Sequence, residues 1–312
     1  MAEQPLLIFD TDMDTDCDDA GALALLLEYV KRGKADLLGM VTDVPVRHAA
    51  PCCEVIGRYY GVERPIGAVP AAAYPAEETD RYARYRAHHE NCTPRRYNRL
   101  LAPRVGKTDA DYPAAAALYR QLLASAPDGS ITVVCVGTLT ALAQLLLTGP
   151  DETSPLSGRE LLEHKAAVVI SMGYPDKTGD NFNWEMDAPA AELFLARCPV
   201  PVVVSGYGGS VITGSSLSGK FPAEHPVRLA YETFTGGPNR GRSSWDLIAV
   251  LYGVEPDAPV LRTEEKGTCR FAAQEVRSYW EAGDRRDREL LPAVGDEELA
   301  AYLEARLTGE FQ

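Results

Sequence analysis

Basic residues are scarce in this chain of 312 residues. Its 31 lysines and arginines are outnumbered by 45 aspartates and glutamates, which gives a formal net charge of −14. Such a surplus of acidic groups argues against the binding of nucleic acid or of an anionic membrane through bulk electrostatics. A small neutral or cationic substrate, or a metal ion, is compatible with this charge.

Three further absences narrow the class of protein. The sequence contains no apolar stretch long enough to span a membrane, and no basic leader precedes its first apolar run. Its seven cysteines include no Cys-x-x-Cys pair, which argues against a zinc site or a redox motif. Scattered cysteines of this kind are typical of reduced thiols, so we predict a cytoplasmic protein.

Short apolar runs alternate along the chain with longer segments of helical spacing. We predict buried strands at five runs bounded by glycine, proline or polar residues: Leu6–Phe9, Leu37–Val41, Ile131–Val136, Ala166–Ile170 and Val200–Val204. We predict helices between them: Asp18–Lys34, Ala49–Tyr60, Tyr112–Ala126, Thr138–Leu147 and Ala188–Ala196. This alternation predicts an α/β fold, with a mostly parallel central sheet covered by helices in a single domain over residues 1–312.

One segment breaks the alternation. Residues 71–111 mix tyrosine, arginine and histidine, including His88 and His89, with little periodicity. We predict an irregular insertion over one end of the sheet, which is either a solvated, partly helical loop or a lid over a site. Near the end of the chain, the amphipathic pattern of Asp296–Leu307 predicts a packed helix.

The first predicted strand is followed by an unusual density of carboxylates. Six aspartates fall within ten residues, directly before a predicted helix: Asp10, Asp12, Asp14, Asp16, Asp18 and Asp19. In open α/β sheets, ligands bind beyond the carboxyl ends of strands. Six carboxylates so close together repel one another unless a cation holds them, and oxygen ligands suit Ca²⁺ or Mg²⁺. A helix start needs only one aspartate, so we predict a divalent-cation site and a metal-dependent enzyme.

Two later segments carry weaker signals. Asn181 and Asn183 follow the predicted strand Ala166–Ile170 and straddle Phe182, and in an extended segment they would point the same way. They are therefore either ligands of a polyhydroxylated molecule or parts of a turn rich in asparagine and glycine. Asp246 opens the apolar helix Leu247–Val254, where it either joins the site or only caps the helix.

These segments together resemble the inosine–uridine-preferring nucleoside hydrolase family over nearly the whole chain. The family's opening Asp-x-Asp, followed shortly by Asp-Asp-Ala, is similar to Asp10-Thr11-Asp12 with Asp18-Asp19-Ala20. The run Gly137–Ala143, after the strand Val133–Val136, is similar to its Gly-Pro-Leu-Thr-Asn segment. The stretch from Met172 to Asn183 is similar to its Met-Gly-Gly…Glu-Phe-Asn segment, and Trp245-Asp246 takes the place of its His-Asp pair.

The resemblance implies a nucleoside-hydrolase-like domain with its active site at the C-terminal ends of the strands. It implies Ca²⁺-dependent hydrolysis of the N-glycosidic bond of a ribonucleoside, or a related N-riboside, to ribose and free base, in purine or pyrimidine salvage. The partner would be a small-molecule nucleoside, and the chain would form a homo-oligomer, either a dimer or a tetramer.

The resemblance also implies roles for individual residues. The implied metal ligands are Asp12, Asp19, Asp246 and the carbonyl of Val136. Asp12 would in addition act as the catalytic base that takes a proton from the attacking water. The implied substrate contacts are Asp18, Asn181 and Asn183 at the ribose and Trp245, His88 and His89 at the base. Asp10 and Asp16 would support the aspartate loop from behind.

The sequence departs from the family pattern at several positions. Asn181 stands where the family usually has glutamate, and Asp43 replaces an asparagine. Trp245 replaces the histidine that commonly assists the leaving base; tryptophan can stack on a base but cannot protonate it.

Two other functions compete with a nucleoside hydrolase. A haloacid-dehalogenase-like phosphatase would explain Phe9–Asp12 after a strand and Gly179-Asp180, but it leaves Trp245-Asp246 without a role. A non-catalytic binder of metal and ribose would explain the retained aspartates together with the lost acid–base groups. Turnover of a nucleoside distinguishes both from the family reaction.

Overall fold

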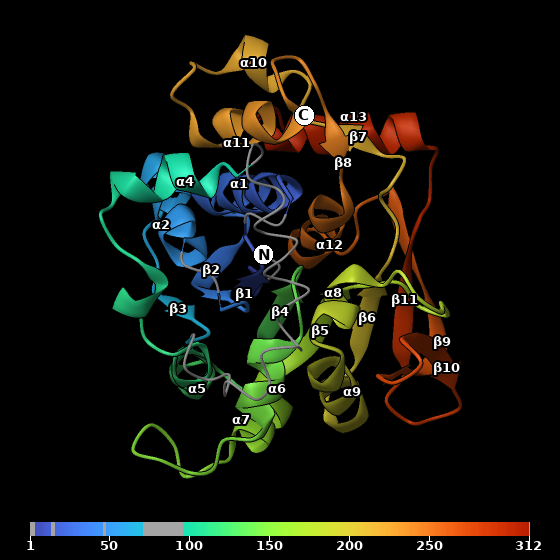
Figure 1. Cartoon of the computed structure of the whole chain (residues 1–312). Coiled ribbons are helices and arrows are strands. Elements are labelled where there is room, and N and C mark those ends of the chain that lie inside the picture. Colours follow the sequence, from blue (N-terminus) through green and yellow to red (C-terminus); the bar gives the residue numbers. More distant parts are fainter. Residues whose placement is uncertain (1–3, 14–15, 46–47, 71–95, 312) are drawn as a thin grey trace.

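The computed structural model describes residues 4–13, 16–45, 48–70 and 96–311. Nine strands form a central sheet in the order β10-β9-β11-β6-β5-β4-β1-β2-β3 (Figure 1). These strands are β1 Leu6–Thr11, β2 Asp36–Thr42, β3 Ile66–Ala68, β4 Ile131–Cys135, β5 Ala166–Met172, β6 Val202–Ser205, β9 Leu261–Ala272, β10 Arg277–Glu281 and β11 Asp287–Pro292. β1 to β6 and β11 run parallel, whereas β9 pairs antiparallel with β10 and β11. The predicted α/β fold with a mostly parallel sheet is confirmed.

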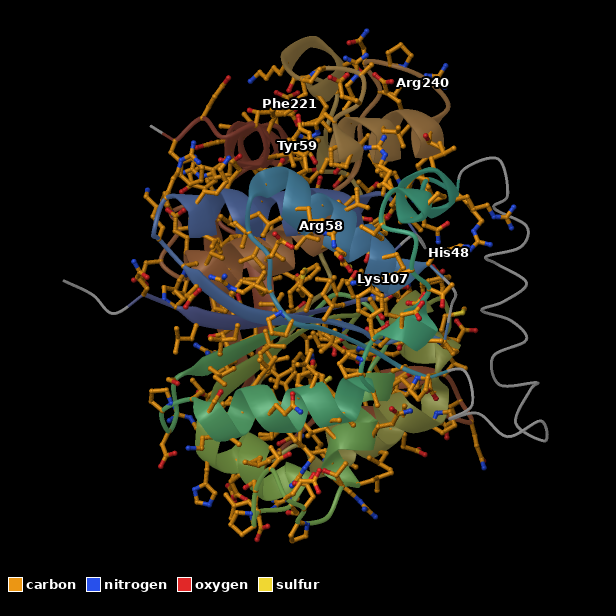
Figure 2. All side chains as sticks on the ribbon, turned by 90° about the vertical axis from the view of Figure 1, so that its left-hand side faces the viewer. His48, Arg58, Tyr59, Lys107, Phe221 and Arg240 are labelled. Atoms are coloured by element: carbon orange, nitrogen blue, oxygen red, sulfur yellow. The ribbon has the colours of Figure 1, made fainter. Side chains whose placement is uncertain are left out.

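Helices cover both faces of this sheet, which Figure 2 shows nearly edge-on. One layer contains α1 Asp18–Lys31, α2 Ala49–Tyr60, α11 Pro226–Thr235, α12 Trp245–Val254 and α13 Asp296–Leu307. The other contains α5 Ala115–Ser125, α6 Thr140–Leu146, α7 Gly158–Lys165 and α9 Ala188–Arg197. Each layer has its own cluster of buried apolar side chains. The strands between them are buried on both faces, which is why they read as continuous apolar runs.

The other described elements are short. They are α4 Asn98–Leu101, η4 Ala102–Arg104, η5 Asp109–Asp111, α8 Phe182–Met186, α10 Leu217–Lys220 and the two-stranded sheet of β7 Ile212–Thr213 with β8 Arg242–Ser243. Part of the predicted insertion 71–111 lies outside the described residues, including His88 and His89. Its described part, residues 96–111, forms α4, η4 and η5 against α2.

The helix α1 is buried all round. Its residues from Asp18 to Tyr29 are continuously buried, because α2, α11, α12 and α13 pack around it. A helix enclosed in this way has an apolar sequence without one polar face. Its first turn is therefore held rigidly beyond the ends of the strands, where the aspartates are.

Candidate metal and substrate site

The site lies where the order of the strands reverses. From β1 the sheet extends outward through β2 and β3, and the chain then returns to place β4 on the other side of β1. Open parallel sheets bind ligands at such a reversal. The backbone N–H of Val136, directly after β4, donates to the carbonyl of Asp10 in β1 at 2.8 Å. The loop that carries Asp12 is thereby fixed beside Val136.

Gly137 allows these segments to meet. A Cβ atom at this position would lie 2.4 Å from Oδ2 of Asp43 and 2.5 Å from the backbone nitrogen of Asp12. Non-bonded atoms do not approach so closely, so any larger residue would push the aspartate loop away from β4.

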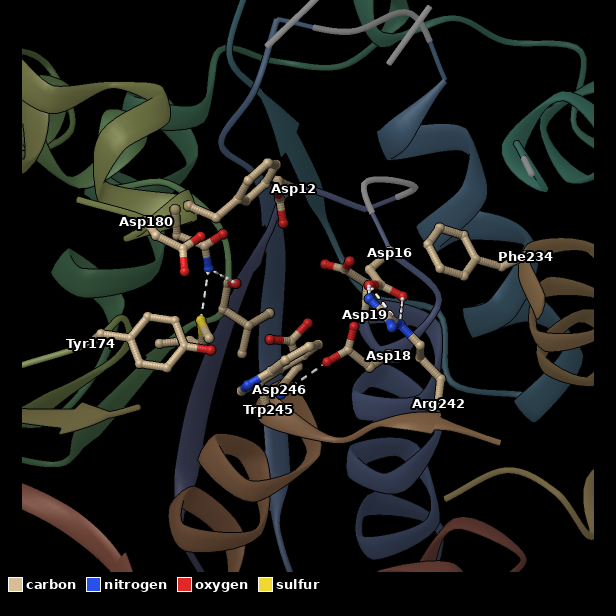
Figure 3. A pocket seen from close by; sticks show the side chains of 14 residues that line it. Asp12, Asp16, Asp18, Asp19, Tyr174, Asp180, Phe234, Arg242, Trp245 and Asp246 are labelled. Carbon is tan, nitrogen blue, oxygen red and sulfur yellow. Dashed lines mark hydrogen bonds and ion pairs between the residues drawn. The ribbon is translucent and has the colours of Figure 1, made fainter. Parts of the chain in front are cut away.

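Three buried carboxylates converge at this point (Figure 3). Carboxylate oxygens of Asp18, Asp19 and Asp246 lie within 4.8 Å of one another. Asp18 and Asp19 occupy the first turn of α1, and Asp246 occupies the first turn of α12, a helix that packs against α1. Both helix N-termini place their partial positive charge near these carboxylates. The backbone N–H of Asp246 also donates to Oδ2 of Asp18 at 3.3 Å.

Electrostatics in this group favour a cation. Burial, followed by the charge of neighbouring aspartates, raises the carboxyl pKa of Asp18, Asp19 and Asp246 well above the usual range. A divalent ion would oppose this effect by stabilising the charged forms. The donors are carboxylate oxygens, which hard cations such as Ca²⁺ and Mg²⁺ prefer. The residues present therefore fit a divalent metal.

The carboxylates open into a cavity of about 430 Å³. Its lining combines carboxylates, aromatic rings and one cation: Asp12, Asp16, Asp18, Asp19, Val136, Met172, Tyr174, Asp180, Phe182, Asn183, Phe234, Arg242, Trp245 and Asp246. Most of the residues singled out from the sequence are thus brought into one cavity. The predicted metal ligands include Asp12, whereas the three carboxylates that converge include Asp18 in its place. Asp12 also lines the cavity.

Asn181 is an exception. The expectation of an extended segment from Asn181 to Asn183 is wrong, because Phe182–Met186 forms helix α8. The fully buried side chain of Asn181 donates to the carbonyl of Tyr174 at 2.8 Å and accepts from its N–H at 3.1 Å. Asn181 therefore fixes the turn that presents Tyr174, and it does not line the cavity.

Asn183 does reach the cavity from the first turn of α8. Its Nδ2 donates to the carbonyl of Val136 at 2.6 Å and lies 3.1 Å from the sulfur of Met172. Its Oδ1 has no hydrogen-bond partner among the described residues. A ligand hydroxyl can donate to that oxygen.

Asp10 and Asp43 lie fully buried behind the cavity. The Tyr119 hydroxyl donates to Oδ2 of Asp10, and a carboxylate oxygen of Asp10 lies within 4.8 Å of one of Asp43. A negative charge on one of these buried carboxyls opposes ionisation of the other. Burial raises the pKa of Asp10 to about 7, against the opposing effect of the hydrogen bond from Tyr119.

The sequence analysis did not identify Arg242. Its Nε lies 2.9 Å from Oδ2 of Asp16, and its Nη2 lies 2.5 Å from the same oxygen. Asp16 is one of six acids in the aspartate loop, so a cationic partner for it could be expected, but no motif marks Arg242 as that partner. Tyr174 and Phe234 were missed as well, since no motif accompanies them.

Trp245 lies at the edge of the carboxylate group, directly before Asp246. Gly208 has φ of +141°, and a Cβ there would lie 2.7 Å from the Cα of Trp245, so a glycine is needed behind the tryptophan. No histidine is present in the described part of the cavity lining. The predicted base contacts His88 and His89 lie outside the described residues.

Fold and site together define an α/β enzyme with a carboxylate centre suited to a metal ion. The sequence profile of the family described as inosine-uridine preferring nucleoside hydrolase matches residues 7–269. The chain belongs to this family, and it is therefore a hydrolase of N-glycosidic bonds. A search of curated proteins finds no match.

Solved structures show the same fold at low sequence identity. The plant nucleoside hydrolase PpNRh1 is 18% identical with a TM-score of 0.66, and the alignment covers 98% of this chain and 99% of that one. The inosine-uridine preferring nucleoside hydrolase of Bacillus anthracis is 15% identical with a TM-score of 0.65, covering 99% and 100%. The type III effector protein XopQ, solved with adenosine diphosphate ribose, is 14% identical with a TM-score of 0.69, covering 99% and 94%.

Every helix among the described residues is too short or too polar to span a lipid bilayer.

Proposed function

We propose that the protein hydrolyses the N-glycosidic bond of a ribonucleoside, yielding ribose and a free base, and that it requires Ca²⁺. The observation that carries this proposal is the convergence of Asp18, Asp19 and Asp246 within 4.8 Å at the end of the parallel strands. Family membership supplies the bond that is broken. Family membership alone also leads us to propose a cytoplasmic homo-oligomer that acts in nucleoside salvage.

The metal would be held by Asp12, Asp19, Asp246 and the carbonyl of Val136. When bound, such an ion orders sugar hydroxyls and makes water a better nucleophile. We favour Ca²⁺ because the site offers several carboxylates and a carbonyl, and calcium accepts many oxygen ligands in a flexible arrangement.

The chain's own residues would do the remaining work. The carboxylate of Asp12 lines the cavity and would accept a proton from the attacking water. Asp18 and the Oδ1 of Asn183 would accept hydrogen bonds from the ribose hydroxyls. The ring of Trp245 would stack against the base.

A nucleoside panel tests the proposal. Purified protein is incubated with inosine, guanosine, uridine and cytidine, with added Ca²⁺ or with a chelator, and free base is measured by chromatography. We expect release of base in calcium and its loss in chelator. Saturable nucleoside binding without release of base would instead establish a non-catalytic binder, and elemental analysis of gently purified protein tests the identity of the ion.

A further inference from the structure

Arg242 is the only cationic side chain in the described lining of the cavity. Asp16 occupies its Nε and Nη2, whereas Nη1 makes no hydrogen bond to any described residue. The side chain is 36% exposed and lines the cavity, and Nη1 is the nitrogen of the guanidinium that Asp16 leaves unused. The family reaction as proposed above has no use for it.

Two aromatic rings fix the position of this guanidinium. Its central carbon lies 5.3 Å from the ring centroid of Trp245 and 5.5 Å from that of Phe234, distances at which a cation is attracted to a ring. In Figure 3, Arg242 and Phe234 lie at one side of the carboxylate group, and Tyr174 and Asp180 lie at the other.

This arrangement indicates where the sugar and the base of a bound nucleoside would lie. Asn183, one of the proposed ribose contacts, is held against Val136 and Met172, whereas Arg242 lies against the rings of Trp245 and Phe234. Trp245 and Phe234 offer the apolar surface that a planar base requires. The base would therefore lie beside Arg242.

The base needs help when it departs. Cleavage of the bond between C1′ and nitrogen leaves the electron pair on the base, which departs as an anion if no acid protonates it. Arg242 is a poor acid because its hydrogen bonds with Asp16 raise its pKa further above the usual range. A fixed guanidinium can nevertheless stabilise an anion by donating hydrogen bonds without giving up a proton.

We propose that Arg242 is a catalytic residue that stabilises the departing base as an anion through its Nη1 edge. This inference rests on the proposed function. The oxygen of water bonds to C1′, and its proton passes to the carboxylate of Asp12. The electron pair of the broken bond moves to the base, which takes a proton from solvent after release. Arg242 remains protonated throughout.

Asp16 holds the guanidinium ready for this role. Its Oδ1 accepts from the N–H of Cys17 at 2.7 Å, and its carbonyl accepts from the hydroxyl of Tyr97 at 2.8 Å. The anchor is thus fixed at both its side chain and its backbone. A donor held in place before reaction does not have to be reorganised as charge develops.

The test compares two leaving groups in the calcium-loaded protein. One substrate is the best nucleoside of the panel. The other is 4-nitrophenyl β-D-riboside, whose leaving nitrophenolate is already a stable anion near neutral pH. The variants are Arg242→Gln and Arg242→Lys, with Arg240→Gln as the matched control. Arg240 is exposed outside the cavity, where its Nη1 donates to the carbonyl of Thr235 at 2.9 Å (Figure 2).

We expect Arg242→Gln to lower kcat for the nucleoside about 10²-fold and to change kcat for the nitrophenyl riboside by less than about threefold. Arg242→Lys, which keeps the charge, should fall between wild type and the glutamine variant on the nucleoside. Arg240→Gln should match wild type on both substrates. The calcium concentration for half-maximal activity should be the same in all four proteins.

Three results would overturn the inference. Equal losses on both substrates, or a raised calcium requirement, would show that Arg242 only positions the aspartate loop. Wild-type rates in Arg242→Gln would show that the base departs without it. Each of these results would leave the proposed function intact. A wild-type protein that releases no base from any nucleoside would instead refute the proposed function, and this inference with it, whether or not it cleaves the nitrophenyl riboside.

Discussion

Replacing Asp246 by asparagine should stabilise the metal-free protein and weaken its response to calcium. Asp246 is buried, with a carboxylate oxygen within 4.8 Å of oxygens of Asp18 and Asp19. Two ionised carboxylates at this separation repel by about 3 kcal/mol at an effective dielectric constant of about 20. The total repulsion on Asp246 has an upper limit, because the folded protein can protonate this carboxyl instead. Protonation at about pH 7.5 costs about 5 kcal/mol for a group whose pKa in the unfolded chain is about 3.9.

The substitution removes this penalty but buries an amide in its place. We therefore expect the free energy of unfolding of the metal-free variant to rise by about 1–3 kcal/mol. Calcium should stabilise the wild type by about 3 kcal/mol when present at a hundredfold excess over its Kd, and should stabilise the variant much less. The variant's advantage in free energy of unfolding over the wild type should therefore shrink or reverse when calcium is added.

Urea unfolding followed by tryptophan fluorescence, in chelator and in calcium, measures both effects. The matched control is Asp180→Asn, which changes a carboxylate in the same cavity whose side chain is 93% exposed and paired with Lys177. This control should behave as wild type in both solutions. If the metal-free Asp246→Asn protein were less stable than the wild type, the carboxylates would not be repelling one another and the electrostatic case for a metal would fail.

Three other predictions concern catalysis, pH and the base. Asp12→Asn should lower kcat on the order of 10²–10⁴-fold while the fold survives, because the proposed base is lost; near-wild-type turnover with an unchanged circular dichroism spectrum would place the base elsewhere. Metal-free wild type should lose stability as pH rises from about 4 through 7, because the folded state keeps protons that the unfolded chain has released. Asp10, with its pKa raised to about 7, and Asp18, Asp19 and Asp246, also raised, hold those protons; a melting temperature in chelator that rises over this range would contradict the sign. Trp245→Ala should reduce kcat/KM more for purine than for pyrimidine nucleosides, since the larger ring system gains more from stacking. A wild type that prefers pyrimidines would refute stacking. The same panel with His88→Ala and His89→Ala tests the predicted contacts of these histidines with the base.

The parallel part of the sheet was predictable because its strands are buried on both faces. The apolar runs Leu6–Phe9 and Ile131–Val136 correspond to β1 and β4. The strands β9 to β11, which form one end of the sheet, escaped prediction because they carry charge, as Glu264 and Lys266 in β9 illustrate. Such strands alternate imperfectly and resemble loops in sequence.

Some residues of the site could likewise be predicted from the sequence, and others could not. The aspartates of the first loop could be found because their density has no ordinary structural explanation. Arg242 and Phe234 could not, because they come from segments that only the folded chain brings to the cavity. Asn181 was misplaced because two asparagines separated by one residue point together in a strand but not in a helix, and the local period was misjudged.

The contact between Asp18 and Asp246 also has a consequence for synthesis on the ribosome. The two residues are 228 positions apart in the chain. At usual rates of translation, α1 precedes α12 by roughly 10–45 seconds. During that interval the nascent chain carries Asp18 and Asp19 without Asp246, so the complete group of three carboxylates cannot form. Assembly of the centre is instead a late event, and a chain interrupted before α12 would lack the centre itself.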